Sequence, residues 1–300
     1  MRIVVTGRTG QVSRALQELA GRRRAIELVA LGRPGLDLSD RASVAAAIGA
    51  ARPDAVINAA AYTAVDKAEE DEAVAQAVNA DGAGNVAEAT DRLGIPVIHL
   101  STDYVFDGQS DRPYVEADTP APLNAYGRSK LAGERLVTFA NPRHAVVRTS
   151  WVHSPFGPNF VLTMLRLAQT RPEISVVADQ FGAPTSALEI AYELLHMAPK
   201  LVERADDAMR TGIFHMTAAG STSWAGLAAF VFEQSRSLGG PAAVVRPIQT
   251  TDYPTKAKRP LNSRLGGTRL HDGYGIALVD WRVGVAETVR RILSEGKLLS

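Results

Sequence analysis

Residues 4–13 read VVTGRTGQVS, and this stretch decides the fold. The β-branched run that it extends, Arg2–Thr6, predicts a strand, and the pattern that follows predicts a helix near Gln11–Leu19. Gly7 and Gly10 allow a tight turn between the two, and they let the backbone approach a diphosphate closely. A strand, a glycine turn and a helix in this order are typical of the first unit of a dinucleotide-binding fold.

Short apolar runs alternate with helical patterns through the first half of the chain. Strands are predicted at Glu27–Leu31, Ala55–Ala59, Val97–Ser101 and Ala145–Ser150, and helices at Ala42–Ala51, Ala73–Leu93 and Tyr126–Thr138. Because such apolar strands are usually covered on both faces, we expect an α/β fold with a Rossmann-type doubly wound parallel sheet. Residues 1–150 are predicted to form the dinucleotide-binding domain. Residues 151–300 are predicted to form a smaller, mostly helical substrate-binding lobe, with some segments returning to the first domain.

The composition excludes several classes of function. The chain has 300 residues, of which 46% are hydrophobic, and its net charge of +1 favours neither nucleic acid nor an anionic membrane as a partner. The absence of cysteine excludes disulfides, thiolate metal sites and a cysteine nucleophile. The histidines show no metal-ligand spacing, so we expect no metal. The N-terminal apolar run is too short for a signal peptide, and we expect a cytoplasmic protein.

The glycine turn and the end of the second strand indicate the cofactor. The N–H groups of Gly10, Gln11 and Val12 are expected at a helix N-terminus, which favours an anion. The second predicted strand ends without a carboxylate for a ribose 2′-hydroxyl, and Arg33 follows it, a residue that suits a 2′-phosphate. We therefore predict NADPH, with NADH possible and Arg8 assisting. The alternative is that both arginines are solvated surface residues.

Two further segments complete the predicted cofactor site. One is Asp37 with Leu38, which we place near the adenine. The other follows the third strand, where small side chains let the backbone run close to the cofactor; its candidates are Ala60, Ala61, Tyr62 and Thr63. Ser13 occupies the position of the third glycine of the motif, and we expect it to widen the helix–strand packing slightly without abolishing the site.

A candidate catalytic group follows the fourth strand. Thr102 and Asp103 come at its carboxyl end, where open α/β sheets bind ligands, and Tyr126 and Lys130 lie one helical turn apart. A neighbouring ammonium lowers the pKa of a phenol, so the pair can exchange a proton with a carbonyl or alcohol, while Thr102 polarises the same oxygen. The alternative for Tyr126 and Lys130 is an ordinary amphipathic helix face.

Motifs along nearly the whole chain support the catalytic interpretation. They are GRTGQV, DLSD, INAAAYTAVDKAE, STDYVFDG, NAYGRSKLAGE, RTSWV, NFV, DQFGAPT and PTKAKRPLNSRL. The chain resembles the extended short-chain dehydrogenase/reductase family and, within it, the reductases of dTDP-L-rhamnose synthesis, which serves cell-wall polysaccharides. The resemblance implies reduction of the C4 keto group of dTDP-4-dehydro-6-deoxy-L-mannose with NADPH to give dTDP-L-rhamnose. Tyr126 would donate the proton. Lys130 would hold the ribose and lower the Tyr126 pKa. Thr102 would orient Tyr126 and the substrate.

The resemblance also implies substrate contacts by Thr102, Asp103, Trp151 and Arg259. From the residues alone, Trp151 is as readily a core aromatic. Lys256, Lys258 and Arg259 are candidates for the substrate diphosphate, or they are solvated residues of a loop. Some family members bind Mg²⁺ at a dimer interface through a glutamate on the first helix. Ala15 takes that position here, so we expect a monomer or weak homodimer rather than the magnesium-bridged dimer.

Two other functions remain open at this point. A sugar-nucleotide epimerase or dehydratase of the same superfamily would carry tightly bound nicotinamide cofactor through purification. A non-catalytic regulatory subunit, resembling that of methionine adenosyltransferase, would co-purify with a larger partner and show no turnover. The retention of Thr102, Tyr126 and Lys130 together argues against lost chemistry.

Overall fold

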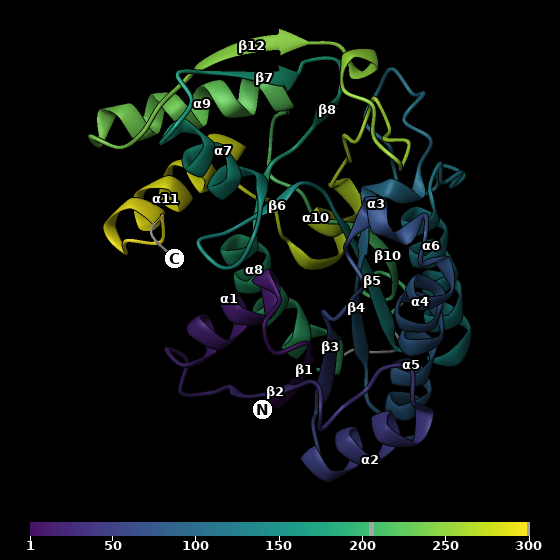
Figure 1. The fold of residues 1–300 in the computed structure, drawn as a ribbon. Coiled ribbons are helices and arrows are strands. Elements are labelled where there is room, and N and C mark those ends of the chain that lie inside the picture. Colours follow the sequence, from purple (N-terminus) through teal and green to yellow (C-terminus); the bar gives the residue numbers. More distant parts are fainter. Residues whose placement is uncertain (204–206, 299–300) are drawn as a thin grey trace.

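A computed structural model describes residues 1–203 and 207–298, and it is built around one parallel sheet (Figure 1). The sheet has six strands in the order β10-β5-β4-β3-β1-β2. Its strands are β1 (Arg2–Thr6), β2 (Glu27–Leu31), β3 (Ala55–Asn58), β4 (Val97–Thr102), β5 (His144–Thr149) and β10 (Gly212–His215). All of their pairings are parallel, which confirms the predicted Rossmann-type α/β fold.

Helices cover both faces of the sheet, as the continuously apolar strands predict. On one face, Ile3 and Val5 of β1 pack in a core with two helices, α1 (Gln11–Ala20) and α8 (Ala187–Glu203). On the other face, Val4 of the same strand packs in a second core. The helices of this second face are α2 (Arg41–Ala51), α5 (Gly82–Arg92) and α6 (Ala125–Ala140). Successive residues of β1 thus bury opposite sides of one strand.

The strand order places the glycine turn at the switch point of the fold. β1 pairs with β2 on one side and with β3 on the other, so the winding of the chain reverses there. In parallel sheets of this kind, ligands bind outside the carboxyl ends of the strands at such a point. Gly7 after β1 and Asp103 after β4 both lie at that edge, on strands separated only by β3.

A second lobe packs around its own core. It contains α7 (Phe160–Ala168), β7 (Glu173–Val177), α9 (Trp224–Ser237), β12 (Val244–Ile248) and α11 (Trp281–Ser294). Short strands connect the two parts: β6 (Val152–His153), β8 (Phe181–Gly182), β9 (Thr185–Ser186) and β11 (Thr222–Ser223). The helix α10 (Thr268–Tyr274) packs in the sheet core beside β10. In Figure 1 the second lobe stands to the upper left of the sheet, while α8 and β10 return to it.

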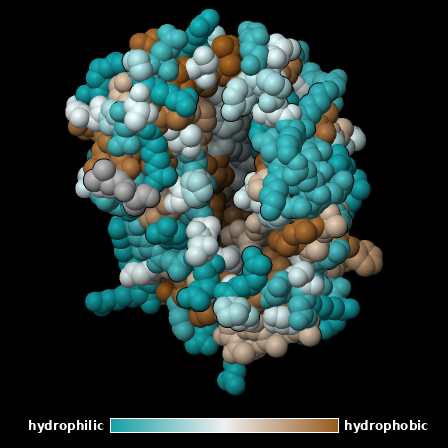
Figure 2. Space-filling model, viewed as in Figure 1, coloured by the Kyte–Doolittle hydropathy of each residue, from teal (hydrophilic) through white to brown (hydrophobic). Residues whose placement is uncertain are grey.

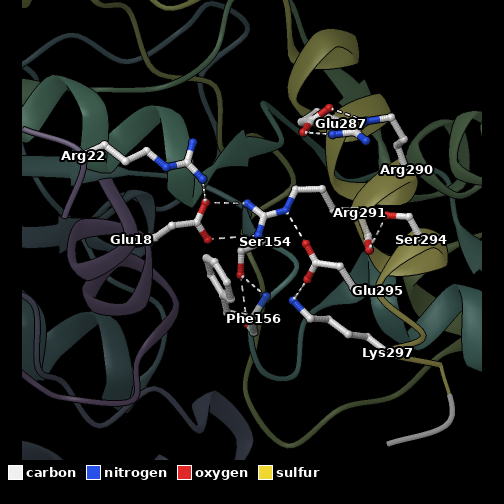
Figure 3. A network of polar contacts seen from close by, with 10 residues as sticks. All are labelled: Glu18, Arg22, Ser154, Phe156, Glu287, Arg290, Arg291, Ser294, Glu295 and Lys297. Carbon is white, nitrogen blue, oxygen red and sulfur yellow. Dashed lines mark hydrogen bonds and ion pairs between the residues drawn. The ribbon is translucent and has the colours of Figure 1, made fainter. Parts of the chain in front are cut away.

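A polar contact joins the second lobe to the first domain (Figure 3). Glu18 of α1 accepts two hydrogen bonds from Arg291 of α11, of 3.0 and 2.9 Å. The Phe156 ring lies beneath this pair, with the guanidinium carbons of Arg14 and Arg291 at 5.1 and 5.3 Å from its centre. The contact ties the first helix after the glycine turn to the last helix of the chain.

The predicted long helix over Ala73–Leu93 is confirmed, and it contains a π-helical turn that the sequence does not predict. The chain forms α3 (Val65–Ala68), α4 (Glu72–Gln76), a π-helical turn η1 (Ala77–Asp81) and then α5. Within the turn, Asn79 accepts a hydrogen bond from the backbone N–H of Tyr62 and donates to Ser129. The alanine-rich sequence keeps a helical period through this region, so the pattern does not reveal the turn.

The described helices show no membrane span. Across residues 1–203 and 207–298, none combines the length and hydrophobicity that a bilayer crossing requires.

Candidate active site

The glycine turn has the geometry that a diphosphate requires. Gly7 has φ +88°, and a Cβ there would lie 3.1 Å from the Cβ of Ala60, so a larger residue would be strained and crowded. Gly10 precedes α1 without any side-chain cap and has open space where a Cβ would stand. The first backbone N–H groups of α1 therefore face an open space with no capping side chain, which fits an anionic group.

The two residues after Gly10 lie at the start of α1, as predicted. Val12 is buried in the sheet core. The side chain of Gln11 turns toward the second lobe, where its oxygen accepts hydrogen bonds from Ser154 and from Asn159, the residue that caps α7. Gln11 thus has a side-chain role, joining the two parts of the molecule, that the sequence analysis does not predict.

The end of β2 is positively charged. A Cβ on Gly32 would lie 3.1 Å from the Cγ of Arg8, so the Arg8 side chain crosses the start of the loop that contains Arg33. Both arginines are exposed. Asp37 accepts a hydrogen bond from Ser39, whereas Leu38 is 6% exposed and packs against Gly82 of α5. The Leu38 side chain therefore belongs to the core, and any contact with an adenine would come from its backbone or from Asp37.

The segment after β3 lies against the glycine turn. The Ala60 N–H donates to Thr6 Oγ1 at 3.2 Å, and the Tyr62 N–H donates to Asn79. The Tyr62 hydroxyl donates to Asp71, and burial raises its pKa. Ala61 lies between these residues and is half-buried, while Thr63 is exposed. The segment thus runs close to Gly7, as its small residues predict.

Thr102 and Asp103 form a buried polar group where β4 ends. Thr102 Oγ1 donates to Asp103 Oδ1 at 2.9 Å, and Ser150 donates to Oδ2 at 3.2 Å. Ser263, from the predicted substrate loop, also bonds to this carboxyl group. Asp103 is only 3% exposed, and burial raises its pKa to about 6 despite these hydrogen bonds.

Tyr126 stands in the first turn of α6, beside Thr102. The Asn124 side chain caps the helix, and the Tyr126 ring meets that of Tyr104 edge to face, with centres 5.8 Å apart. Burial raises the Tyr126 pKa to about 12, a hydrogen bond with Thr102 lowers it, and the Asp103 charge raises it. The predicted lowering by Lys130 is not among these causes, and the net shift is upward.

Lys130 points into the protein beneath Tyr126. It is 2% exposed, and its Nζ donates to the carbonyl oxygen of Leu100 at 2.6 Å and lies 3.4 Å from His99 Nε2. Burial lowers the Lys130 pKa to about 8, and Glu134 opposes that shift.

The small residues around Tyr126 pack closely against the protein's own backbone. A Cβ on Gly127 would lie 2.2 Å from the backbone oxygen of Tyr104, and a Cβ on Gly133 would lie 2.1 Å from that of Asn79. Ser129 is buried and accepts a hydrogen bond from Asn79. These contacts let α6 lie directly on the backbone, which brings Tyr126 to Thr102.

The structure adds polar residues that the sequence analysis misses. Arg148 and Glu134 form a buried ion pair, 1% and 2% exposed, with Arg148 Nη2 at 2.7 Å from Glu134 Oε2. Ser101 donates to the same carboxylate. His99 and Asn58 are also buried and bonded to each other. For Asn58, His99 and Arg148, the signal in the sequence is a polar residue inside an otherwise apolar strand.

Trp151 lies between the two parts of the molecule. Its ring stacks on Trp224 with centres 3.5 Å apart, and a Cβ on Gly182 would lie 2.4 Å from it. Its backbone has φ +49°, which is uncommon outside glycine. Trp151 remains half-buried, with Trp224 and Gly182 both packed against its ring.

A cavity of about 550 Å³ opens beside this region. It is lined by Asp107, Gly108, Gln109, Ser110, Leu123, Asp179, Phe181, Lys258, Arg259, Leu261, Asn262 and Arg264. Figure 2 shows the face of the molecule hollowed between the second lobe and the part that carries α3 to α6. Arg259 lines the cavity but is paired with Asp66 at 2.6 Å, and Lys256 is paired with Glu70.

Within residues 1–203 and 207–298 there is no group of three or more His, Cys, Asp or Glu side chains arranged to hold a metal ion. Ala15, at the position of the family's metal-binding glutamate, is fully buried in the core between α1 and the sheet.

Comparisons with known proteins show the family to which the chain belongs. The family model described as the RmlD substrate binding domain matches residues 1–294. A dTDP-4-dehydrorhamnose reductase from Sinorhizobium fredii is 48% identical over 297 residues, which cover 99% of both chains. A crystal structure of a dTDP-4-dehydrorhamnose reductase from Clostridium acetobutylicum superposes with a TM-score of 0.90 at 35% identity, covering 98% of this chain and 100% of that chain.

A second solved structure, a dTDP-4-dehydrorhamnose reductase from Bacillus anthracis in complex with NADP, has a TM-score of 0.87 at 34% identity and covers 96% of this chain and 98% of its own. The family match spans nearly the whole sequence, and the relatives exceed 30% identity over nearly their full length. The chain therefore belongs to the RmlD substrate-binding-domain family, the family of the dTDP-4-dehydrorhamnose reductases, as its sequence motifs predict.

Proposed function

We propose that the protein reduces the C4 keto group of dTDP-4-dehydro-6-deoxy-L-mannose with NADPH to give dTDP-L-rhamnose. The observation that carries this proposal is the meeting of Tyr126 and Thr102 at the carboxyl edge of the sheet, two strands from the glycine turn. Relatives of 48% identity that are named for this reaction support the choice of substrate. The epimerase and regulatory alternatives have no comparable observation in their favour.

Tyr126 is the proposed proton donor to the C4 oxygen. Its raised pKa keeps the phenol protonated at neutral pH, so the proton is present when the oxygen becomes basic. Thr102 hydrogen-bonds to the phenol and also donates to Asp103, so its hydroxyl is held in place between the two. Bound NADPH would supply the hydride. Lys130 is proposed to hold the nicotinamide ribose, and its effect on the Tyr126 pKa stays a prediction.

The proposed cofactor site is the open turn of Gly7, Gly10, Gln11 and Val12 together with the strand ends nearby. The uncapped start of α1 would bind the diphosphate through backbone N–H groups. Arg8 and Arg33 would bind a 2′-phosphate, so NADPH is the proposed cofactor, with NADH a weaker substitute. The NADP complex of the relative from Bacillus anthracis supports this assignment.

The nucleotide-sugar is proposed to occupy the space between the lobes. The cavity presents Lys258, Arg259 and Arg264, and these cations suit a diphosphate. Its two carboxylates are already bonded, Asp107 to Tyr114 and Asp179 to Thr250, so they oppose the anion less than free carboxylates would. Trp151 and Asp103 would contact the sugar.

The test follows NADPH absorbance with purified protein and dTDP-4-dehydro-6-deoxy-L-mannose, for wild type and for Tyr126→Phe. The expected result is oxidation by the wild type and a loss of at least about a hundredfold in kcat for the variant, since the proton donor is removed. Tyr192→Phe, which changes an exposed tyrosine of α8, is the matched control. Folded wild type that binds NADPH but does not oxidise it would refute the proposal.

The cytoplasmic location and the monomeric or weakly dimeric state are retained as parts of this proposal. Sedimentation velocity with and without Mg²⁺ measures the oligomeric state. A mass that is independent of Mg²⁺ is the expected result, because Ala15 offers no carboxylate.

A further inference from the structure

A buried polar row crosses three strands of the sheet and ends at Lys130. Thr6 of β1 is the register partner of Asn58 of β3, and Asn58 is the register partner of His99 of β4. Register partners on adjacent strands point to the same face of a sheet. This is the face that α6 covers, and Lys130 reaches it from that helix. Thr6, Asn58, His99 and Lys130 are all between 0% and 2% exposed.

The hydrogen bonds of the row are continuous. Thr6 Oγ1 donates to Asn58 Oδ1 at 2.5 Å, and Asn58 Nδ2 lies 3.0 Å from His99 Nδ1. The other ring nitrogen of His99, Nε2, lies 3.4 Å from Lys130 Nζ. Four buried polar side chains of this kind are costly to enclose unless each finds a partner. Here each has one, in a row that runs from the residue before the glycine turn to the lysine of the catalytic helix.

The order of donors along the row fixes the form of the histidine. Thr6 gives its only hydroxyl hydrogen to the Asn58 oxygen, so the Asn58 amide presents its N–H to His99. His99 Nδ1 must then accept, and in the neutral ring the hydrogen lies on Nε2. Burial, reinforced by the Lys130 charge, holds the His99 pKa well below its usual value, so the ring is neutral.

We propose that His99 is a positioning residue for Lys130, and that the row Thr6–Asn58–His99 holds its ring with the Nε2 hydrogen facing the lysine. A donor opposite an ammonium group disfavours the charged lysine and favours the amine, which can accept. The effect of the row on the protonation of Lys130 therefore opposes that of Glu134, which favours the ammonium. Its importance for reduction rests on the proposed function, whereas the form of the ring and its effect on Lys130 do not.

The other groups that bear on the protonation of Lys130 are accounted for. Glu134, one turn along α6, favours the ammonium, but it is paired with Arg148 of β5 and accepts from Ser101. Leu100 contributes only a carbonyl oxygen, which accepts from either form of the lysine. Of the titratable groups named here, His99 is the one that the structure places within 3.4 Å of Nζ.

Two substitutions are expected to replace the hydrogen-bond donor that faces Lys130 with an acceptor. Asn58→Asp places a carboxylate between Thr6 and His99, which accepts from both, so the ring hydrogen moves to Nδ1 and a bare Nε2 faces Lys130. His99→Glu presents a carboxylate oxygen to the lysine, while its other oxygen accepts from Asn58. Both changes favour the ammonium, and we expect each to raise the Lys130 pKa by about one unit or more. His144→Gln is the control, because it replaces a buried histidine of β5 that bonds to Asn141.

The experiment is NMR on cofactor-free protein. Lysine labelled with ¹³C at Cε reports the Lys130 pKa, with Lys130→Arg used to assign the signal, and ¹⁵N-labelled histidine reports which ring nitrogen of His99 carries hydrogen. The expected result is Nε2–H in wild type, Nδ1–H in Asn58→Asp, and a raised Lys130 pKa in both row variants but not in the control. Wild-type His99 protonated at Nδ1, or a Lys130 pKa unchanged in both variants, would overturn the inference. Neither readout needs turnover, so a failure of the proposed function would be recognised separately.

Discussion

At the scale of single residues, the site combines groups whose pKa values are moved by burial. Tyr126 is kept a phenol, Asp103 is made a weaker acid, and Lys130 is made a weaker base. Each shift favours the neutral form of its group, as expected where water is excluded. At neutral pH the Tyr126 phenol is therefore protonated, whereas Asp103, with a pKa of about 6, is mostly ionised and Lys130, with a pKa of about 8, is mostly charged.

Arg33 is predicted to select NADPH over NADH. It lies in the loop after β2 next to Arg8, with no carboxylate at the strand end. We expect Arg33→Ala to raise the KM for NADPH about tenfold and to leave that for NADH nearly unchanged, because only a 2′-phosphate would lose an ion pair. Initial rates with each cofactor measure this, with Arg24→Ala as an exposed control. Equal effects on both cofactors would place Arg33 outside the 2′-phosphate site.

Asp103 is predicted to destabilise the folded protein as pH rises. Its folded-state pKa of about 6 exceeds the ordinary value of 3.8, so the folded state binds the proton more tightly than the unfolded chain. The free energy of unfolding therefore loses up to about 3 kcal/mol between pH 4 and pH 7 through this group. Asp103→Asn removes that loss, so its stability relative to wild type should increase over this range.

Urea unfolding at several pH values tests the Asp103 prediction. The exposed Asp272→Asn variant serves as a control for the loss of a charge. If the stability of Asp103→Asn runs parallel to that of wild type from pH 4 to pH 7, the carboxyl group is not the source of the dependence.

At the scale of elements, the placement of α6 decides whether Tyr126 reaches Thr102. The helix lies on the 3₁₀ turn η2 (Asp103–Val105) and on η1 at two points where only glycine fits, Gly127 and Gly133. Its buried Glu134 is held by Arg148, which fixes the same helix to β5. The spacing of Tyr126 and Lys130 on one helix is therefore only part of the geometry, and the closeness of the helix to the sheet supplies the rest.

Gly127→Ala is predicted to impair both catalysis and stability. Its Cβ would fall 2.2 Å from the Tyr104 oxygen, so the first turn of α6 must move away from η2. We expect a loss of about 1–3 kcal/mol in stability, typical of overpacking, and at least a tenfold loss in kcat/KM. Gly49→Ala, in α2 with no atom within 4 Å of its Cβ, is the control and should stabilise by about 0.5–1 kcal/mol. Unchanged kcat/KM in Gly127→Ala would show that the contact does not position Tyr126.

The elements also show what the sequence can and cannot predict. Apolar strands and the glycine turn predict the sheet because each signal is local, and the positions of Gly7, Tyr126 and Lys130 follow from it. The π-helical turn around Asn79 is hidden because alanine fits either helix. The row through His99 and the pair of Glu134 with Arg148 depend on strand register and helix packing, which join residues far apart in the chain.

At the scale of the whole molecule, the second lobe must hold its place beside the sheet for Trp151 and the cavity to take part in the proposed site. Two contacts achieve this near the glycine turn. One is the Gln11 side chain, which bonds to Ser154, and the other is the pair of Glu18 with Arg291 above the Phe156 ring. Both start from α1, so the helix expected to bind the cofactor also anchors the lobe.

Breaking the contact between Glu18 and Arg291 is predicted to weaken the attachment of the second lobe to α1. Arg291→Met removes the ion pair that joins α11 to Glu18 on α1, in which the two side chains are 15% and 24% exposed. A partly buried ion pair contributes more to stability than a surface ion pair does. We therefore expect a loss of about 1–2 kcal/mol in the free energy of unfolding, and faster proteolysis between the lobes. Arg290→Met is the control, because its exposed partner Glu287 lies on the same helix and the change should cost less than about 0.5 kcal/mol. Equal urea midpoints and digestion rates for the two variants would mean that the pair does not hold the lobe, and Gln11 would then be the remaining link at α1 to test.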